Sequence, residues 1–269
     1  MDKIQRNERI SALVKTLTDS PGKLFTLGYF TGMFGSAKST LSEDIDIVRS
    51  SFEKFGLGTI DTVSGASGGV KYIPKPGNDK ISSFVKGLCE ELSHKERILA
   101  GGYLYMLDII YNPEIVSEIG RIFAGKFFDK QADYVITVET KGIPLAFMTA
   151  RYLNVPLLIV RHYSEATDGA SVNINYISGS SKNIQTMVLP MKSLKRNSRL
   201  LFIDDFMKGG GTAKGILELA REFNCTVEGI GVLIQTSEPS RKLVDNCLSI
   251  VKLKEVDEEN GNVDIIPGI

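Results

Sequence analysis

The chain has 269 residues, of which 42% are hydrophobic and 24% are charged, and its formal net charge at pH 7 is zero. This composition is typical of a globular protein, and the balanced charge gives no sign by itself of a nucleic-acid partner. No apolar run is long enough to cross a bilayer, and the opening residues MDKIQRNERI are not a signal peptide. We therefore expect a cytoplasmic protein with no membrane partner, and the length suggests two domains.

Cysteine and histidine are too few and too scattered to build a metal site. Cys89, Cys225 and Cys247 are odd in number, which argues against a disulfide framework and predicts reduced, buried thiols. The two histidines, His94 and His162, argue against a zinc site and against a Ser-His-Asp triad. We therefore predict that the protein's own side chains form no metal site.

The first 75 residues predict three helices followed by a β-hairpin. A helical pattern runs from about residue 3 to residue 17 and ends at a Pro-Gly pair. A second helix is expected over 26–34, opening on a threonine that can cap it, and a third from residue 36 or 37 to about 55. The stretch 59–76, TIDTVSGASGGVKYIPKP, then predicts two short strands around a glycine-rich tip. This order of elements is that of a winged helix-turn-helix domain.

The third helix of such a domain enters the DNA major groove with its N-terminal residues toward the bases. Short hydroxyl side chains and one lysine occupy those positions here, and they suit phosphate and base-edge contacts. We predict that double-stranded DNA is contacted by Ser36, Lys38, Ser39, Thr40 and Ser42, with Arg6, Arg9 and Lys23 on the phosphate backbone and Lys71 from the wing.

The charge of this region leaves an alternative open. Residues 1–75 hold ten basic and eight acidic side chains, and several of the acidic ones lie on the third helix itself. A winged helix that binds another protein, or that only dimerises, has the same pattern. Dimerisation would also concentrate the modest positive charge across two DNA half-sites.

Two more strand-turn-helix units follow in the middle of the chain. Residues 133–142, DYVITVETKG, predict an apolar strand and a short polar turn, and the helical pattern IPLAFMTARYL comes next. The stretch VPLLIVRHY predicts another strand, which ends at Arg161. Residues 164–187 are then polar and rich in Ser, Gly and Asn, which is typical of a flexible loop.

The stretch 200–212, LLFIDDFMKGGGT, carries the most information about function. Its apolar run predicts a buried parallel strand that ends in two adjacent carboxylates, Asp204 and Asp205, and a glycine loop then opens a helix. Backbone N–H groups converge at such a loop and form an anion site, and glycine lets the backbone approach a phosphate closely. The carboxylates would repel phosphate, so they need sugar hydroxyls or a bridging metal as partners. The stretch therefore predicts binding of a phosphorylated ribose.

This motif is neither a Walker loop nor a dinucleotide fingerprint. It resembles the 5-phosphoribosyl-1-pyrophosphate (PRPP) loop of type I phosphoribosyltransferases. The resemblance implies that Asp204 and Asp205 hold the ribose hydroxyls and that the following loop surrounds the 5-phosphate. The ligand contacts in this segment are then Asp204, Asp205, Phe206, Met207, Lys208, Gly209, Gly210, Gly211 and Thr212.

The same resemblance implies a role for the middle units. The polar turn matches the pyrophosphate turn of the family at Thr140, Lys141 and Gly142, with backbone N–H groups and the Lys141 ammonium as donors. Arg161 stands where the family often has a basic residue that reaches the pyrophosphate. Residues 164–187 take the place of the flexible loop that closes over the active site in the enzymes.

Over nearly its full length the chain resembles the purine operon regulators of low-GC Gram-positive bacteria. The best matches are SAKSTLSEDI, GGVKYIPK, ERILAGGYLYMLDI, TKGIPLAF, INYISGSS and IDDFMKGGGT. The resemblance implies an α/β protein: a winged helix-turn-helix domain over residues 1–75 and a type I phosphoribosyltransferase domain over 76–269, with a mainly parallel sheet flanked by helices. It also implies a homodimeric regulator that binds DNA upstream of purine genes and senses PRPP, with Mg²⁺, without consuming it.

Two further segments each allow two interpretations. Tyr103 and Tyr105 form either an aromatic lid over the ligand pocket or contacts in the core or the dimer. The acidic segment KEVDEENGNVD near the C-terminus predicts a frayed strand or a tail.

Other functions compete with the regulator. Lys208 suits anion binding better than general-base work, and no purine-reading residue can be identified, so we predict no catalysis. The alternatives are an active purine phosphoribosyltransferase with an N-terminal oligomerisation domain, and a scaffold with both sites degenerate. For the regulator, two couplings remain open: PRPP orders the 164–187 loop and alters the DNA-binding surface, or PRPP and DNA phosphates compete for one pocket.

Overall fold

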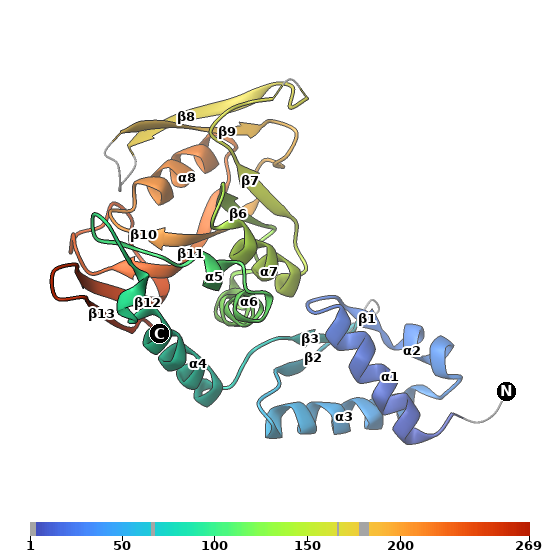
Figure 1. Cartoon of the computed structure of the whole chain (residues 1–269). Coiled ribbons are helices and arrows are strands. Elements are labelled where there is room, and N and C mark those ends of the chain that lie inside the picture. The colour runs from blue at the N-terminus through green and yellow to red at the C-terminus, as the bar shows by residue number, and fades with distance from the viewer. Residues whose placement is uncertain (1–3, 66–67, 166, 178–182) are drawn as a thin grey trace.

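The computed structural model describes residues 4–65, 68–165, 167–177 and 183–269 and folds them into two parts (Figure 1). The first part consists of α1 (Arg6–Asp19), β1 (Phe25–Thr26), α2 (Leu27–Phe34), α3 (Lys38–Lys54), β2 (Thr59–Val63) and β3 (Gly69–Ile73). The strands pair antiparallel in the order β1-β3-β2. Three helices and a small sheet confirm the predicted winged helix.

Local sequence explains the boundaries of these helices. Thr26 caps α2 as predicted, because its hydroxyl accepts a hydrogen bond from the Tyr29 N–H. α1 and α3 begin slightly later than predicted; residue 3 and the wing-tip residues 66–67 lie outside the described residues. Leu13, Phe30 and Leu41 are fully buried where the three helices meet. One apolar core therefore joins the predicted recognition helix to the rest of the winged helix.

The second part is an α/β domain. Its helices are α4 (Asn78–Leu92), η1 (Lys95–Arg97), α5 (Leu107–Ile110), α6 (Pro113–Phe127), η2 (Phe128–Lys130), α7 (Ile143–Leu153) and α8 (Gly211–Glu222). Its strands are β4 (Ile98–Leu99), β5 (Tyr103–Leu104), β6 (Tyr134–Val138), β7 (Leu157–Val160), β8 (Ser171–Ile177), β9 (Ile184–Pro190), β10 (Arg199–Met207), β11 (Thr226–Thr236), β12 (Cys247–Asp257) and β13 (Asn262–Pro267).

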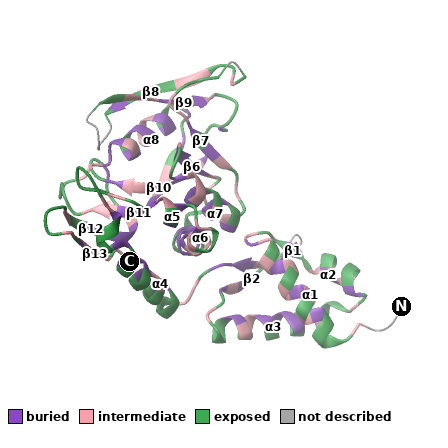
Figure 2. Ribbon diagram, in the orientation of Figure 1, coloured by how far each residue is buried: buried purple, intermediate pink, exposed green. Residues whose placement is uncertain are grey.

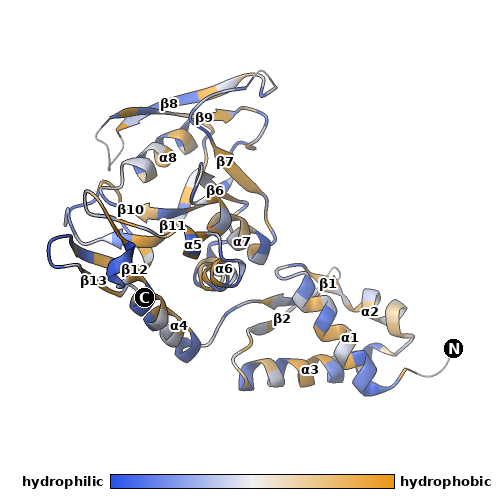
Figure 3. Cartoon of the chain, in the orientation of Figure 1, coloured by the Kyte–Doolittle hydropathy of each residue, from blue (hydrophilic) through white to orange (hydrophobic). Residues whose placement is uncertain are grey.

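The central sheet has the strand order β13-β12-β11-β10-β6-β7, and only β13 runs antiparallel to its neighbour. The mainly parallel sheet predicted from sequence is confirmed. A parallel sheet is covered on both faces, so its strands need continuous apolar sequence. The start of β10, LLFI, meets that need and is buried throughout (Figures 2 and 3). One apolar core lies between the sheet and α4, α6 and α7, and a second lies between the sheet and α8.

The structure corrects two predictions for polar segments. The predicted flexible loop 164–187 contains strand β8 and the start of strand β9, which pair antiparallel and pack on α8. Residues 166 and 178–182 lie outside the described residues. The acidic C-terminal segment is not a tail, because it forms the end of β12, a tight turn and β13 at the edge of the sheet. An edge strand pairs with a neighbour on one side only and commonly carries charged side chains, so polarity alone did not exclude a strand there.

No helix among the described residues is long and apolar enough to span a membrane. The three cysteines are free thiols; Cys89 and Cys225 are buried, as predicted, whereas Cys247 is only partly buried.

Candidate functional site

A cavity of about 350 Å³ opens at the carboxyl ends of β6 and β10, beside the start of α8. Ligands of open parallel sheets bind at this edge, because the turns after neighbouring strands meet there. The cavity is lined by Val138, Glu139, Thr140, Lys141, His162, Tyr176, Gln185, Phe202, Asp204, Asp205, Phe206, Met207, Lys208, Gly209, Gly210, Gly211, Thr212, Ala213 and Val232. The structure thus brings the whole predicted segment 204–212 together with Thr140 and Lys141.

The glycine loop presents the start of α8 to the cavity. Gly210 has a φ of +83°, a backbone conformation that glycine adopts without penalty, and α8 begins at the next residue. The outer side of the loop is fixed by neighbouring chain: the Leu243 N–H donates to the Gly209 carbonyl at 2.9 Å, and Lys242 Nζ donates to the Lys208 carbonyl at 2.6 Å. The first N–H groups of a helix have no partner within the helix, so this loop offers donors to an anion.

The two carboxylates lie inside β10, not after it, and burial makes their charges costly. Asp204 is only 8% exposed, and its pKa is raised well above the ordinary value by burial and by the neighbouring Asp205 charge. Burial also raises the pKa of Asp205, and the nearby Lys141 ammonium partly opposes that shift. Hydroxyl groups donating to these carboxylates would supply hydrogen bonds to their charged forms.

These raised pKa values predict a pH-dependent gain in stability for Asp204→Asn. A carboxylate with a raised folded-state pKa costs stability as pH rises from its unfolded pKa, about 3.9, through its folded pKa. The variant escapes that cost, so its melting temperature should exceed that of the wild type by more at pH 8 than at pH 5.

The control for this prediction is Asp257→Asn. Hydrogen bonds from Asn260 lower the pKa of the half-buried Asp257, so that variant should lose stability at both pH values instead of gaining it. An equal gain for Asp204→Asn at both pH values would contradict the assigned burial cost.

The turn between β6 and α7 forms the opposite wall. The Glu139–Thr140 peptide bond is cis, and Glu139 Oε1 accepts the His162 N–H at 2.7 Å. The predicted residue Gly142 does not line the cavity but lies directly behind it. A Cβ atom at Gly142 would stand 2.6 Å from Asp204 Oδ1 and 2.5 Å from Thr137 Oγ1, so only glycine fits there without a shift of its neighbours.

The lining residues that sequence reasoning missed include three polar side chains from later in the chain, His162, Tyr176 and Gln185. The Tyr176 hydroxyl donates to Gln185 Oε1 at 2.6 Å across the β8–β9 pair, and His162 Nδ1 lies 3.0 Å from the Thr186 carbonyl oxygen. The hairpin is thereby the third wall of the cavity. The alternation of apolar and polar side chains in VNINYI is typical of a half-buried strand. It could have indicated the hairpin, but the segment was interpreted as a loop.

Two predicted ligand residues lie elsewhere. Arg161 forms ion pairs with Glu165 and Asp168, so its guanidinium already has acidic partners outside the cavity. Tyr103 is 64% exposed in the β4–β5 hairpin and is absent from the cavity wall, as is Tyr105. Within the described part of this chain the two tyrosines do not form an aromatic lid.

The predicted DNA surface is partly assembled on α3. Lys38, Ser39 and Ser42 are exposed in its first turns, and Ser36 and Thr40 are partly exposed beside them. Lys38 and Ser42 face a groove of about 620 Å³ between α3 and the wing strands β2 and β3. Lys23 is exposed after α1, with its ammonium 5.0 Å from the centre of the Phe25 ring.

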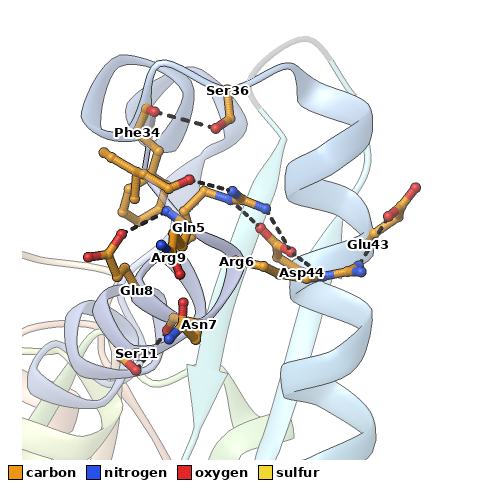
Figure 4. A network of polar contacts seen from close by, with 11 residues as sticks. Gln5, Arg6, Asn7, Glu8, Arg9, Ser11, Phe34, Ser36, Glu43 and Asp44 are labelled. Carbon is orange, nitrogen blue, oxygen red and sulfur yellow. Dashed lines mark hydrogen bonds and ion pairs between the residues drawn. The ribbon is translucent and has the colours of Figure 1, made fainter. Parts of the chain in front are cut away.

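Three predicted phosphate contacts have partners within the chain, and Figure 4 shows two of them, Arg6 and Arg9. Arg9 is 8% exposed and donates from Nε to Asp44 Oδ2 at 2.7 Å, so it is a buried link between α1 and α3. Arg6, which is half-exposed, pairs with Glu43 and Asp44.

Lys71 is the third. Its ammonium lies 4.8 Å from the centre of the Phe128 ring of the second domain and pairs with Asp61. The prediction for Arg9 as a phosphate contact was therefore wrong, because its side chain is buried against Asp44. Lys71 stays partly exposed, so its contact with phosphate remains a prediction.

Comparisons with known proteins match this two-part organisation. Residues 5–74 match the family described as "Bacterial purine repressor, N-terminal", and residues 106–265 match the phosphoribosyl transferase domain. The chain is 45% identical to the purine biosynthesis transcriptional repressor PurR of Bacillus subtilis (strain 168), over 99% of this chain and 93% of that protein. It is 36% identical to the purine biosynthesis transcriptional activator PurR of Lactococcus lactis subsp. lactis (strain IL1403), over 97% of each.

The second domain also matches enzymes. The xanthine phosphoribosyltransferase of Clostridium tetani (strain Massachusetts / E88) is 29% identical over 57% of this chain and 84% of that enzyme. The crystal structure of adenine phosphoribosyltransferase from Rhodothermus marinus DSM 4252 superposes with a TM-score of 0.54 at 16% identity. That match covers 64% of this chain and 99% of the enzyme, and it establishes the phosphoribosyltransferase fold of the second domain.

Proposed function

Since this chain belongs to the PurR family of purine biosynthesis transcriptional regulators, we propose that its winged helix binds control DNA of purine genes and its cavity senses PRPP without consuming it. The observation that carries the ligand proposal is the acid pair Asp204–Asp205 beside the glycine loop at the start of α8. A ligand for this site needs hydroxyl donors and an anion a few ångströms apart, which is the pattern of a ribose 5-phosphate.

The other cavity walls supply the remaining contacts that PRPP would need. The ribose hydroxyls would donate to the two carboxylates, and the 5-phosphate would lie against the N–H groups of residues 209–212. The pyrophosphate would lie against the turn at Thr140 and Lys141, where the Lys141 ammonium offers a charge-assisted donor. Tyr176 and Gln185 close the site from the hairpin side.

Mg²⁺ fits this site only together with the ligand. No cluster of three or more His, Cys, Asp or Glu side chains that could hold a metal occurs among the described residues. Mg²⁺ commonly takes one or two carboxylates, phosphate oxygens and water as ligands, so the acid pair and the pyrophosphate would share it. Its contribution would be to neutralise charge between the carboxylates and the pyrophosphate.

An active purine phosphoribosyltransferase is the second candidate, and the intact cavity together with the match to xanthine phosphoribosyltransferase favours it. Against it, the regulators named above match over nearly the whole chain, whereas the enzymes match only the second domain. We further propose a homodimer, because one winged helix with a small excess of basic residues reaches only one half-site.

A gel-shift titration on purine-gene promoter DNA, with and without PRPP and Mg²⁺ at a stated salt concentration, tests the proposal. Specific binding that changes with PRPP is the expected result. Absence of specific binding, together with pyrophosphate release when a purine base is added, would make the enzyme the correct function.

The DNA surface yields a separate prediction. Lys38→Ala or Thr40→Ala should weaken DNA binding by about 1 kcal/mol, roughly fivefold, and Lys38→Ala should also lower the salt dependence by about one phosphate contact. PRPP affinity should be unchanged, as calorimetry with the ligand alone would show.

Lys54→Ala is the matched control for this prediction, because Lys54 is exposed at the far end of the same helix. If Lys38→Ala and Thr40→Ala bind DNA as tightly as Lys54→Ala, the contact surface lies elsewhere.

A further inference from the structure

Helix α7 begins directly behind the ligand cavity and ends against the winged helix. Its 11 residues lie between the sheet and the first domain (Figure 1) and span about 16 Å at the usual helical rise. The polar turn that lines the cavity leads directly into α7, and its last residues face the turn after α1. A single rigid element thus lies between the two functional sites.

At the cavity end the start of α7 is tightly packed against its neighbours. Gly142 is the N-cap of α7, and even a methyl group there would overlap Asp204 Oδ1 and Thr137 Oγ1. Thr137 Oγ1 is buried and has no hydrogen-bond partner among the described residues. A second arrangement of the turn that gives this hydroxyl a partner would therefore gain a hydrogen bond. Any movement of the Asp204 carboxylate toward the turn must therefore displace the start of α7.

At the other end α7 meets Gly22 of the winged helix. A Cβ atom on Gly22 would stand 2.9 Å from the Leu153 carbonyl oxygen and 3.0 Å from Asn154 Cβ. The Gly22 N–H donates to the Tyr72 carbonyl of β3 at 2.8 Å, so Gly22 is attached to the sheet of the winged helix. Displacement of the end of α7 is thereby passed to that domain.

Between its two ends α7 is held to α6. A Cβ atom on Gly120 of α6 would stand 2.6 Å from Met148 Cβ, so the two helix backbones are in close contact. The Tyr152 hydroxyl lies 2.6 Å from Ser117 Oγ and accepts from Arg121 Nε at 3.2 Å. Close packing of this kind makes the two helices move together instead of deforming.

We propose that α7, moving with α6, transmits occupancy of the cavity to the winged helix, and that Gly22 is the contact through which α7 positions the DNA-binding domain. This rests on the proposed function, since it requires a ligand that contacts Asp204 and the 139–142 turn. Such a ligand has different affinities for two positions of α7 and therefore shifts the equilibrium between them. The winged helix follows α7, so the affinity for DNA also differs between the two positions.

The test is the coupling factor, the ratio of the DNA dissociation constants measured with and without saturating PRPP and Mg²⁺. Couplings of about 5- to 150-fold are usual, and the wild type should lie in that range. Gly22→Ala forces α7 and the winged helix apart and should bring the factor below about twofold. The affinity for PRPP alone, measured by calorimetry, should stay unchanged.

Gly261→Ala is the matched control for backbone strain. Gly261 lies in the β12–β13 turn, and its φ of +66° is close to the +74° of Gly22. A Cβ atom on Gly261 would make only an ordinary contact, with Lys95 Cβ at 3.7 Å. The control should lose similar stability and keep the wild-type coupling.

Asn154→Gly provides a second variant that carries no strain. Asn154 already has a left-handed φ of 58°, which glycine adopts freely, so the change removes the side chain next to Gly22 and nothing else. Its control is Asn224→Gly, with a φ of 54°, which follows α8 on the opposite face of the sheet from α7. The coupling factor should fall at least about twofold for Asn154→Gly and stay unchanged for the control.

Wild-type coupling in either Gly22→Ala or Asn154→Gly would overturn the role of α7, so one well-folded variant of the two is sufficient for the test. A coupling factor of one in the wild type would overturn the proposed function itself, so the two failures are distinguishable.

Discussion

Replacing Asp204 and Asp205 together with alanine should abolish the response of DNA binding to PRPP and leave the DNA affinity of the free protein unchanged. Each carboxylate is expected to accept a ribose hydroxyl, and a hydrogen bond to a charged group contributes about 1.5–3 kcal/mol. Losing both should weaken PRPP binding by at least about 100-fold. Calorimetry with PRPP and Mg²⁺ measures the loss, and the gel shift confirms that DNA binding persists.

The control is Glu258→Ala with Glu259→Ala, another adjacent acid pair, which lies in the exposed β12–β13 turn. Glu258 accepts hydrogen bonds from the backbone N–H groups of Gly101 and Gly102, and neither acid lines the cavity. This control should keep the PRPP affinity of the wild type. A double mutant at 204 and 205 that still responds to PRPP would show that the ligand binds elsewhere.

Breaking the buried Arg9–Asp44 pair should destabilise the winged helix by about 3–5 kcal/mol, because one partner is left as an unpaired buried charge. Asp44→Ala leaves the Arg9 guanidinium, whose side chain is 9% exposed, without its carboxylate. The expected results are a lower unfolding temperature for this domain and loss of DNA binding at that temperature, while PRPP binding to the second domain persists. Thermal unfolding and calorimetry check the two effects.

Glu43→Ala is the matched control for this effect. Glu43 is the preceding residue on α3, its side chain is 68% exposed, and its ion pair with Arg6 lies on the surface. Exposed pairs contribute about 0–1 kcal/mol, so this variant should unfold close to the wild-type temperature. Equal destabilisation by both variants would show that burial of the pair does not matter. Replacing the pair by Arg9→Met with Asp44→Leu should recover much of the loss, because no charge is then buried.

The cavity could be predicted from the sequence wherever it is built from adjacent residues. The segment 204–212 contains an apolar strand, two acids and a glycine loop in one run, and the strand-turn-helix geometry follows from that order. The cap at Thr26 is equally local, since the hydroxyl and the N–H that it accepts are three residues apart. In such cases the chain itself holds the interacting groups near one another before any tertiary contact forms.

The structure differs from prediction where the partner of a residue is distant in sequence. Arg9 and Lys71 are basic residues of the kind that contact DNA. In the structure Arg9 pairs with Asp44, and the Lys71 ammonium lies over the Phe128 ring. Arg161 is in the expected place on its strand, yet its guanidinium pairs with two acids that follow it. No periodicity distinguishes a free cation from a paired one, because pairing depends on which elements meet.

The sequence by itself determined the two-domain order, the winged helix, the parallel sheet and the acid-glycine loop, because short-range periodicity and turn chemistry specify each of them. Tertiary structure decided which cations remain available, that Tyr176 and Gln185 wall the cavity, and that α7 reaches from Asp204 to Gly22. These features depend on the approach of elements far apart in the chain, and only the packing of helices on the sheet sets those distances.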